Sequence, residues 1–256
     1  MSELSKPRFR VIDTGVRDGR RHIAFDAALI ELHKAGRSPD TVRFLRFPPT
    51  VLVGRHQDIA KDVRLDVCRA QGIGLARRMT GGGAIYLDQG QSGWEIVLSR
   101  RRLPMDSLEA YGHAISEAVA AGLEHAFGLP ARFRAPTDIV VEDRKLCGTG
   151  GYFDGDTLVY QGTVLIDVDP ARIASVLNFP PPAAGVASSP PPSLTTLKAE
   201  LGNRAPDVAA VQRAVLDGLA ARLGIALDPG GPSIEEERLA TELHDTEIGT
   251  DAYVFG

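Results

Sequence analysis

The middle of the chain is a succession of short apolar runs, separated by glycine, proline and aspartate and interrupted by one long helical pattern. In that pattern, residues 105–127, apolar side chains recur at helical spacing, and Gly128 and Pro130 follow as stop signals. Strands grouped in the middle with helices around them predict an α+β fold, with central mixed or antiparallel sheets flanked by helices. The runs with the length and side-chain content of strands are residues 41–47, 50–53, 74–77, 84–87, 93–98, 138–142, 145–151 and 157–167.

The remaining segments complete a single predicted domain over residues 1–256. Residues 84–87 and 93–98 are predicted to pair around a turn at Gly90 and Gln91. The segment 180–192, rich in proline, alanine and serine, predicts a mobile loop, and we hypothesise that it acts as a lid. The predicted core spans residues 20–200, and a C-terminal helical part spans 205–256. Further helices are predicted at residues 20–36, 63–71, 207–223 and 233–243.

Composition excludes several classes of protein. With 256 residues, 43% of them hydrophobic, the chain is large enough to bury a full core. A net charge of −4 gives no basic field, so we expect no nucleic-acid partner. Cys68 and Cys147 are too few for a disulfide framework and have no zinc-ligand spacing, which favours a reducing compartment. Because no apolar run has the length of a membrane span or a secretory signal, we expect a cytoplasmic protein without membrane contact.

Three sequence blocks occur in order: FLRFPPTVLVGRHQD at residues 44–58, RRMTGGGAIYLD at 77–88, and TDIVVEDRKLCGTGG followed by YQGTVLID within 137–167. Two arginines, three glycines and a downstream lysine in this order resemble the lipoate-protein ligase A family, a branch of the biotin/lipoate protein ligase and octanoyltransferase superfamily. The resemblance implies the catalytic-domain fold of that superfamily. It also implies an activity in which lipoate is activated with ATP to lipoyl-AMP and the lipoyl group passes to a lysine of an acceptor protein. ATP, Mg²⁺ and lipoate are therefore the expected ligands.

The residue types in these blocks fit that chemistry. Forming an acyl adenylate brings a carboxylate and a triphosphate together, so local cations and bare backbone amides must receive the negative charge. Lys145 is the predicted catalytic residue, because one ammonium on a flexible stem can follow the carboxylate oxygen through the reaction. The resemblance implies the same role. The alternative is a solvated lysine in the charged turn that begins at Glu142.

The glycine segment of the second block is predicted to bind the adenylate. Gly81, Gly82 and Gly83 offer backbone amides without side chains, and Thr80 and Ala84 flank them. An ordinary tight turn is the alternative interpretation.

Arg77 and Arg78 precede this segment at the end of a predicted strand. Neighbouring side chains of a strand point to opposite faces, so one arginine can reach the pocket while the other supports the loop. The sequence leaves open which arginine has which role, and both are candidate substrate-binding residues.

The other candidate residues come from the resemblance. Arg55 and His56 would close one wall of the acyl pocket, with His56 predicted as a hydrogen-bonding residue and a general base as the alternative. Asp138 is a candidate ligand of Mg²⁺ through water, with an ordinary surface carboxylate as the alternative. The residues of the third block expected to border the adenylate are Gly148, Thr149, Gln161, Gly162 and Thr163.

The chain departs from the family at positions that bear on its class. Octanoyltransferases of the superfamily carry the acyl chain on a cysteine thiolate. In one branch that cysteine stands shortly before an Ala-Pro-Ser/Thr turn. The corresponding segment here, residues 132–137, reads RFRAPT and begins with Arg132 where the cysteine would stand. In the other branch the cysteine precedes the His-Gly of the third block, and residues 158–162 of this chain hold no cysteine. Cys147 is predicted to be a packed small side chain, with an unorthodox nucleophile as the alternative, and Cys68 a core residue. Leu87 stands where the family often has histidine, which leaves the hydrogen bonding near the following aspartate open.

The missing cysteine favours a ligase, and other functions remain as alternatives. These are an octanoyl-carrier-protein:protein octanoyltransferase and a non-catalytic lipoate-binding or assembly factor. A biotin-protein ligase is disfavoured, because its Gly-Arg-Gly-Arg-Arg-Gly loop is absent. The expected partner is a lipoyl acceptor domain, from a 2-oxoacid dehydrogenase E2, a glycine-cleavage H-like protein or another lipoate-binding protein. Since no complete small accessory domain is expected after residue 227, a separate accessory subunit is a further possible partner.

Overall fold

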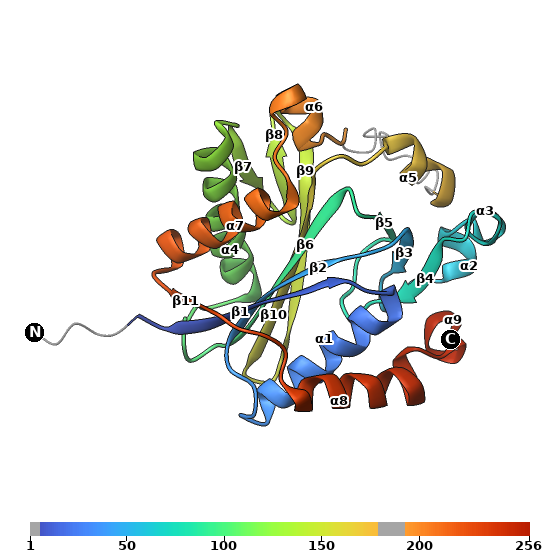
Figure 1. Ribbon diagram of the computed structural model, residues 1–256, viewed down its shortest axis with the longest axis horizontal. Coiled ribbons are helices and arrows are strands. Elements are labelled where there is room, and N and C mark those ends of the chain that lie inside the picture. The colour runs from blue at the N-terminus through green and yellow to red at the C-terminus, as the bar shows by residue number, and fades with distance from the viewer. Residues whose placement is uncertain (1–5, 179–192) are drawn as a thin grey trace, which may run out of the picture.

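A computed structural model describes residues 6–178 and 193–256 of the chain (Figure 1). The predicted loop 180–192, and with it the lid hypothesis, lies outside the described residues. The elements form a large sheet, a small sheet and surrounding helices, so the α+β prediction is confirmed.

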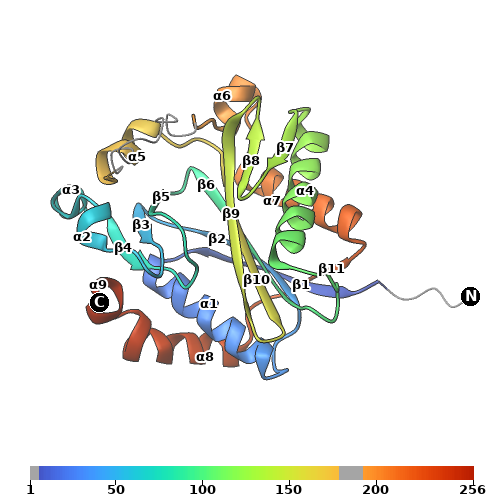
Figure 2. The same ribbon diagram turned by 180° about the vertical axis from the view of Figure 1, so that it is seen from behind.

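The large sheet runs through the centre of the molecule (Figures 1 and 2). Within the described residues it has eight strands in the order β11-β1-β2-β6-β10-β9-β8-β7. β1 pairs in parallel with both β2 and β11, and the other neighbours are antiparallel, so the sheet is mixed. In sheet order, the strands are β11 (Ala226–Pro229), β1 (Arg8–Val16), β2 (Thr41–Arg46), β6 (Gln91–Ser99), β10 (Thr157–Leu165), β9 (Arg144–Asp154), β8 (Asp138–Val141) and β7 (Ala131–Arg134).

Helices lie on both sides of the large sheet, and the small sheet lies on one side, against α1 (Figure 2). Two long helices, α4 (Leu108–Phe127) and α7 (Val208–Leu223), cover one face, and α1 (Gly19–Lys34) with α8 (Ile234–Leu243) covers the other. The small sheet has the order β4 (Gly74–Arg77), β3 (Thr50–Val53), β5 (Ile85–Leu87). The remaining helices are α2 (Ile59–Asp62), α3 (Leu65–Ala70), α5 (Pro170–Val176), α6 (Leu197–Leu201), η1 (Gly202–Arg204), η2 (His244–Ile248) and α9 (Asp251–Phe255).

The α4–α7 face contains the largest hydrophobic cluster. Helix α4 begins at Ser107, whose hydroxyl accepts from the amide of Ala110, and it ends at Gly128 in the left-handed conformation. Where α4 crosses α7, the backbones touch: a Cβ at Gly122 would lie 2.0 Å from the carbonyl oxygen of Ala214. This close approach excludes side chains from the crossing and brings both helices down onto the sheet.

One prediction about local structure was wrong. Residues 84–87 and 93–98 do not pair: β5 pairs with β3 in the small sheet, and β6 lies in the large sheet. The connection from β5 in the small sheet to β6 in the large sheet is held at Gly90. The carbonyl of Gly90 accepts from the amides of Ile166 and Asp167. The predicted helix 63–71 is confirmed as α3, which begins at Leu65 because Val63 is extended and buried where it bridges to Leu177.

Several elements were not predicted, namely the strands β1, β7 and β11 and the short helices α2, α5, α6, η1, η2 and α9. β1 alternates apolar side chains with arginines and other polar residues, and its partners β2 and β11 are parallel strands distant in sequence. Such pairing leaves no local turn signal for sequence analysis to find.

A fully buried arginine, Arg43 on β2, holds α1 to the middle of the large sheet. Its guanidinium forms ion pairs with Asp26 of α1 and with Glu95 of β6, the latter at 2.9 Å between Nη1 and Oε1. Its Nη2 lies 2.9 Å from Nδ1 of His22, whose Nε2 lies 2.8 Å from the carbonyl oxygen of Arg46. The imidazole therefore accepts from Arg43 and donates to Arg46, and burial lowers the pKa of His22 to about 3.

The buried cluster carries two carboxylates and one guanidinium. Burial and the neighbouring Glu95 outweigh the attraction of Arg43 and raise the pKa of Asp26 to about 7. The protonation of Asp26 is therefore linked to folding across the range between its ordinary pKa and neutrality.

We expect Arg43→Met to lower the free energy of unfolding by about 3–5 kcal/mol, because two buried carboxylates lose their partner. Arg8→Met is the control: the ion pair between Arg8 and Asp228 is largely exposed, so its loss should cost about 1 kcal/mol or less. Urea denaturation of both variants at neutral pH makes the comparison, and equal losses would contradict the structural role of Arg43.

We also expect Asp26→Asn to change how stability depends on pH. The folded state keeps a proton on Asp26 that the unfolded state releases, so the wild type loses stability as pH rises from about 4 to about 7. The variant lacks this loss, whereas the opposite effect of His22 is present in both proteins and cancels. Urea denaturation of both proteins at about pH 5 and about pH 8 measures the difference, and a difference that does not change with pH would refute the linkage.

Candidate active site

The strands β9 and β10 divide the candidate residues of the third block between the two faces of the large sheet. Gly148 pairs with Thr163, and Gly150 pairs with Gln161, so these four residues face the side that carries α1. Gly162 faces the α4 side, where a Cβ would lie 2.4 Å from the ring of Trp94.

Thr149 also faces α4, and its Oγ1 lies 2.8 Å from the hydroxyl of Tyr160. The α1 face of these strands therefore carries the uncovered backbone of Gly148 and Gly150, and the α4 face carries residues that pack toward the core. Thr149 and Gly162 belong to the packed set.

Lys145 lies across the open glycine face. A bulge between β8 and β9 sets its register, and its Cε and Nζ lie 2.9 Å from the place that a Cβ at Gly148 would occupy. The backbone is held from both sides, because its amide donates to Ser193 and its carbonyl accepts from Thr195. The side chain is 28% exposed, so the ammonium is fixed in place and still accessible.

Asp138 is the ionic partner of Lys145, at 2.7 Å between Oδ1 and Nζ. Its other oxygen accepts from Nη2 of Arg134 at 2.9 Å. The three side chains carry a net charge of +1, which suits the approach of an anion. An ammonium has three donors, so Lys145 can keep Asp138 and bind a ligand carboxylate at the same time.

The two neighbouring arginines of the second block point to different segments. Arg78 donates through Nη2 to the carbonyl oxygens of Gly81 at 2.8 Å and Gly83 at 2.7 Å, and through Nε to Oγ1 of Thr80 at 3.1 Å. Burial lowers the pKa of Arg78 to about 10, which leaves it cationic at neutral pH. Arg78 therefore fixes the glycine segment, residues 80–83, in which Thr80 is buried and the three glycines are exposed.

Arg77 is buried beneath the preceding segment, residues 54–57, which we call the 54–57 loop. It donates to the carbonyl oxygens of Gly54 at 3.0 Å, Arg55 at 3.2 Å and Gln57 at 2.9 Å. Arg55 and His56 are exposed on this loop. Both arginines therefore support a loop, Arg78 the glycine segment and Arg77 the 54–57 loop, while substrate binding by either stays a prediction.

The 54–57 loop and the glycine segment pack together through their backbones. A Cβ at Gly54 would lie 2.1 Å from the carbonyl oxygen of Gly82, which has a positive φ of 94°. The amide of Arg55 donates to the carbonyl of Thr80 at 2.9 Å. Because no side chain separates the two loops, the position of one fixes the position of the other.

Gln161 connects the open face to the buried charge cluster. Its Nε2 donates to Glu95 at 2.7 Å and to Asp26 at 3.3 Å, so the two carboxylates orient its amide. Sequence analysis missed Asp26, Arg43 and Glu95 as supporting residues. Each of these three charged residues lies within an apolar segment of the sequence, and this pattern could have indicated a buried charge cluster.

The family model for the lipoyl protein ligase A/B catalytic domain matches residues 18–220. The chain belongs to this family. A curated relative, octanoyltransferase LipM of Symbiobacterium thermophilum, is 30% identical over 95% of this chain and 96% of its own length.

Solved structures of lipoate-protein ligases have the same fold. The bipartite lipoate protein ligase of Thermoplasma acidophilum, described together with its E2 lipoyl domain, superimposes with a TM-score of 0.82 at 25% identity, covering 98% of this chain and 96% of that one. A lipoate-protein ligase A bound with ATP gives a TM-score of 0.83 at 25% identity, with 98% and 99% covered. The predicted fold family is therefore confirmed, whereas the relatives' names divide between ligase and transferase.

Among members of the lipoyl protein ligase A/B family, the accessibility of a thiol bears on the class of reaction. This chain has two cysteines, and both are fully buried. Burial raises the pKa of Cys147 to about 12, and burial also raises the pKa of Cys68. Arg132 is exposed and forms an ion pair with Asp143. Neither thiol is available as a surface thiolate at neutral pH.

The described residues do not form a metal site of their own. Across residues 6–178 and 193–256, no group of three or more histidine, cysteine, aspartate or glutamate side chains is arranged to hold a metal ion. Both carboxylate oxygens of Asp138 already contact cations. These contacts do not fit a Mg²⁺ ligand, so no step is assigned to the metal, and the metal role of Asp138 stays a prediction.

Among the helices of residues 6–178 and 193–256, none combines the length and the apolar character that crossing a membrane requires.

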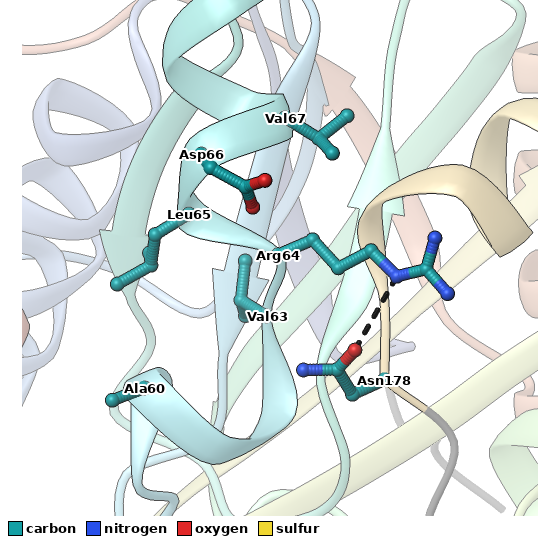
Figure 3. Close-up of a pocket in the computed structure, with 7 residues that line it drawn as sticks. All are labelled: Ala60, Val63, Arg64, Leu65, Asp66, Val67 and Asn178. Carbon is teal, nitrogen blue, oxygen red and sulfur yellow. Dashed lines mark hydrogen bonds between the residues drawn. The ribbon is translucent and has the colours of Figure 1, made fainter.

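A surface hollow lies beside α2 and α3 (Figure 3). There Nε of Arg64 lies 3.4 Å from Oδ1 of Asn178. None of the candidate substrate residues lines this hollow, so it is not part of the candidate active site. Its lining residues are Ala60, Val63, Arg64, Leu65, Asp66, Val67 and Asn178.

We expect Gly54→Ala to destabilise the fold by about 1–3 kcal/mol, because the new methyl group collides with the backbone of Gly82 and forces the two loops apart. Gly231→Ala is the control, since a Cβ there meets nothing within 4 Å, and it should change stability by about 0.5 kcal/mol or less. The measurement is the free energy of unfolding in urea. Similar values for the two variants would show that the loops are not in contact.

Proposed function

We propose that this chain is an ATP-dependent lipoate-protein ligase, which forms lipoyl-AMP and transfers the lipoyl group to a lysine of an acceptor domain. The observation that carries the proposal is the burial of both thiols. Acyl transfer without ATP in this superfamily needs a cysteine thiolate that can reach the acyl donor. Here Cys147 has a pKa near 12 and no exposed surface, and an exposed arginine, Arg132, occupies one of the expected cysteine positions.

The first half-reaction joins lipoate to AMP. A carboxylate oxygen of lipoate attacks the α-phosphorus of ATP, the bond from that phosphorus to the bridging oxygen of pyrophosphate breaks, and pyrophosphate leaves. The ammonium of Lys145 would hold the carboxylate, since it lies over the bare backbone of Gly148 with donors to spare. The three exposed glycines of the glycine segment would offer their backbone amides to the triphosphate of ATP.

In the second half-reaction the acceptor lysine, as a free amine, attacks the acyl carbonyl. The bond between the carbonyl carbon and the AMP oxygen breaks, AMP leaves, and the nitrogen releases a proton. Lys145 would stabilise the negative charge that develops on the carbonyl oxygen. The solved neighbour described with an E2 lipoyl domain supports an acceptor of that kind, and an H-like protein is a second acceptor to assay.

Octanoyl transfer is the second candidate function, because the curated relative at 30% identity is named an octanoyltransferase. It predicts acylation from octanoyl carrier protein without ATP. In this chain the reaction would have to proceed either through Cys147 or Cys68, which are both buried, or without a thioester.

The test is intact-mass analysis of an apo lipoyl domain incubated with the chain, lipoate and Mg-ATP. We expect a mass gain that requires ATP, falls by about 100-fold or more in Lys145→Ala, and persists in Cys147→Ser. Lys34→Ala is the matched control, because Lys34 is similarly exposed and lies 2.9 Å from Asp154. Lys34 is the last residue of α1, whereas the first residue of the helix, Gly19, meets the small sheet. The control variant should retain the wild-type rate.

Parallel reactions separate the other functions. Octanoylation from octanoyl carrier protein without ATP, lost in Cys147→Ser, would overturn the ligase proposal in favour of a transferase. Transfer from synthetic lipoyl-AMP, with none from lipoate and ATP, would assign adenylate formation to a separate accessory subunit. Failure of every reaction would leave a non-catalytic lipoate-binding protein.

A further inference from the structure

The short helix α9 packs beside the small sheet, close to the 54–57 loop (Figures 1 and 2). Val254 of α9 is fully buried in a cluster with Val51 and Val53 of β3 and with Ile59 of α2. Thr250 caps the helix, since its hydroxyl accepts from the amide of Tyr253 at 3.2 Å. The helix is therefore a packed part of the domain, although it lies far in sequence from the three sequence blocks.

Arg77 joins α9 to the 54–57 loop. The guanidinium that donates to Gly54, Arg55 and Gln57 also donates to the carbonyl oxygens of Tyr253 at 3.1 Å and Val254 at 2.8 Å. The side chain is 5% exposed, so a donor that lost its acceptor would be left unpaired inside the protein. Moving either segment away from Arg77 therefore costs free energy.

The link continues from the 54–57 loop to the glycine segment. The backbones of Gly54 and Gly82 touch, and the amide of Arg55 donates to Thr80. A displacement of α9 is thus passed through Arg77 to the 54–57 loop and on to the glycine segment, with no flexible side chain between the two loops.

We propose that α9 is a positioning element of the substrate site, which acts through Arg77 to hold the 54–57 loop and the glycine segment in their binding geometry. Arg77 is then a positioning residue. The inference rests on the proposed function for the identity of the ligand, lipoate, but its mechanical part concerns the loops alone. Coupling between two sites is reciprocal, so a ligand that orders the loops must also stabilise α9.

The structure offers a way to disturb α9 without touching the loops. Thr250→Ala removes the cap of α9, and Thr250 makes its hydrogen bonds with Glu247 and Tyr253. Ser233→Ala is the matched control, because it removes the equivalent cap of the neighbouring helix α8, which Arg77 does not contact. Arg77→Lys, which keeps the charge and loses the planar fork, tests the bridge directly.

Two measurements test the proposal on the whole chain. Hydrogen–deuterium exchange should be faster in Thr250→Ala not only in residues 249–256 but also in the 54–57 loop and the glycine segment. The Kd for lipoate, from isothermal titration, should rise about five- to tenfold in Thr250→Ala and further in Arg77→Lys, with kcat changed by about twofold or less. Ser233→Ala should leave both loops and the Kd unchanged, and adding lipoate to the wild type should slow exchange in residues 249–256.

The outcomes separate this inference from the proposed function. Faster exchange in Thr250→Ala confined to residues 249–256, with the loops unchanged, would overturn the positioning role of α9. So would the same loop response in Ser233→Ala, because it would show a general loosening. If the wild type binds no lipoate, the ligase proposal fails, while the exchange comparison still decides whether α9 holds the loops.

Discussion

The architecture depends on one buried guanidinium. Arg43 sits in the central region of the large sheet and contacts carboxylates from α1 and from the adjacent strand, so it fixes how α1 lies on the sheet. The same helix begins against the small sheet, where a Cβ at Gly19 would lie 2.7 Å from the side chain of Thr50. The relative placement of the two sheets, and with it the geometry of the candidate site, therefore follows from a charge cluster that water does not reach. A buried cluster of this kind is costly unless it is fully paired, which limits the arrangements that the chain can adopt.

The candidate site is built mainly from backbone, and arginines hold that backbone in place. Arg78 fixes the glycine segment and Arg77 fixes the 54–57 loop, in each case by donating to carbonyl oxygens. A guanidinium suits this task because its five N–H groups are spread in one plane and can reach several carbonyls at once. Glycine-rich loops are flexible in isolation, so ligand binding here relies on supports that lie outside the loops themselves.

Sequence analysis anticipated those parts of the fold that are encoded locally. The strands around residues 41–53 and 138–167, the long helix α4 and the three sequence blocks were all visible, because periodicity, caps and motifs act over a few residues. The pairing of β5 with β3 instead of β6, and the parallel position of β1 between β2 and β11, were not. These depend on contacts between segments far apart in the chain.

The same limit applies within the site. Alternation along a strand predicted that Arg77 and Arg78 diverge, but only the structure assigns Arg77 to the 54–57 loop and α9. The third block gave Gly148, Thr149, Gln161, Gly162 and Thr163 as one group, whereas the antiparallel register places Thr149 and Gly162 on the opposite face. The face of the sheet on which a side chain lies, and how deeply that side chain is buried, depend on the assembled sheet and are not encoded in a sequence motif.

Under the proposed function, the burial of both thiols has a consequence for handling a sulfur-containing substrate. Lipoate carries a strained five-membered cyclic disulfide, and an accessible protein thiolate can open such a ring by thiol–disulfide exchange and form a mixed disulfide. Cys147 lies only two residues from Lys145, yet its sulfur is enclosed on the core side of the sheet with its proton held firmly. An enzyme with this arrangement can bring the dithiolane close to its own chain without being captured by it. In a ligase of the proposed kind, the reactive ring would stay intact for the acceptor domain.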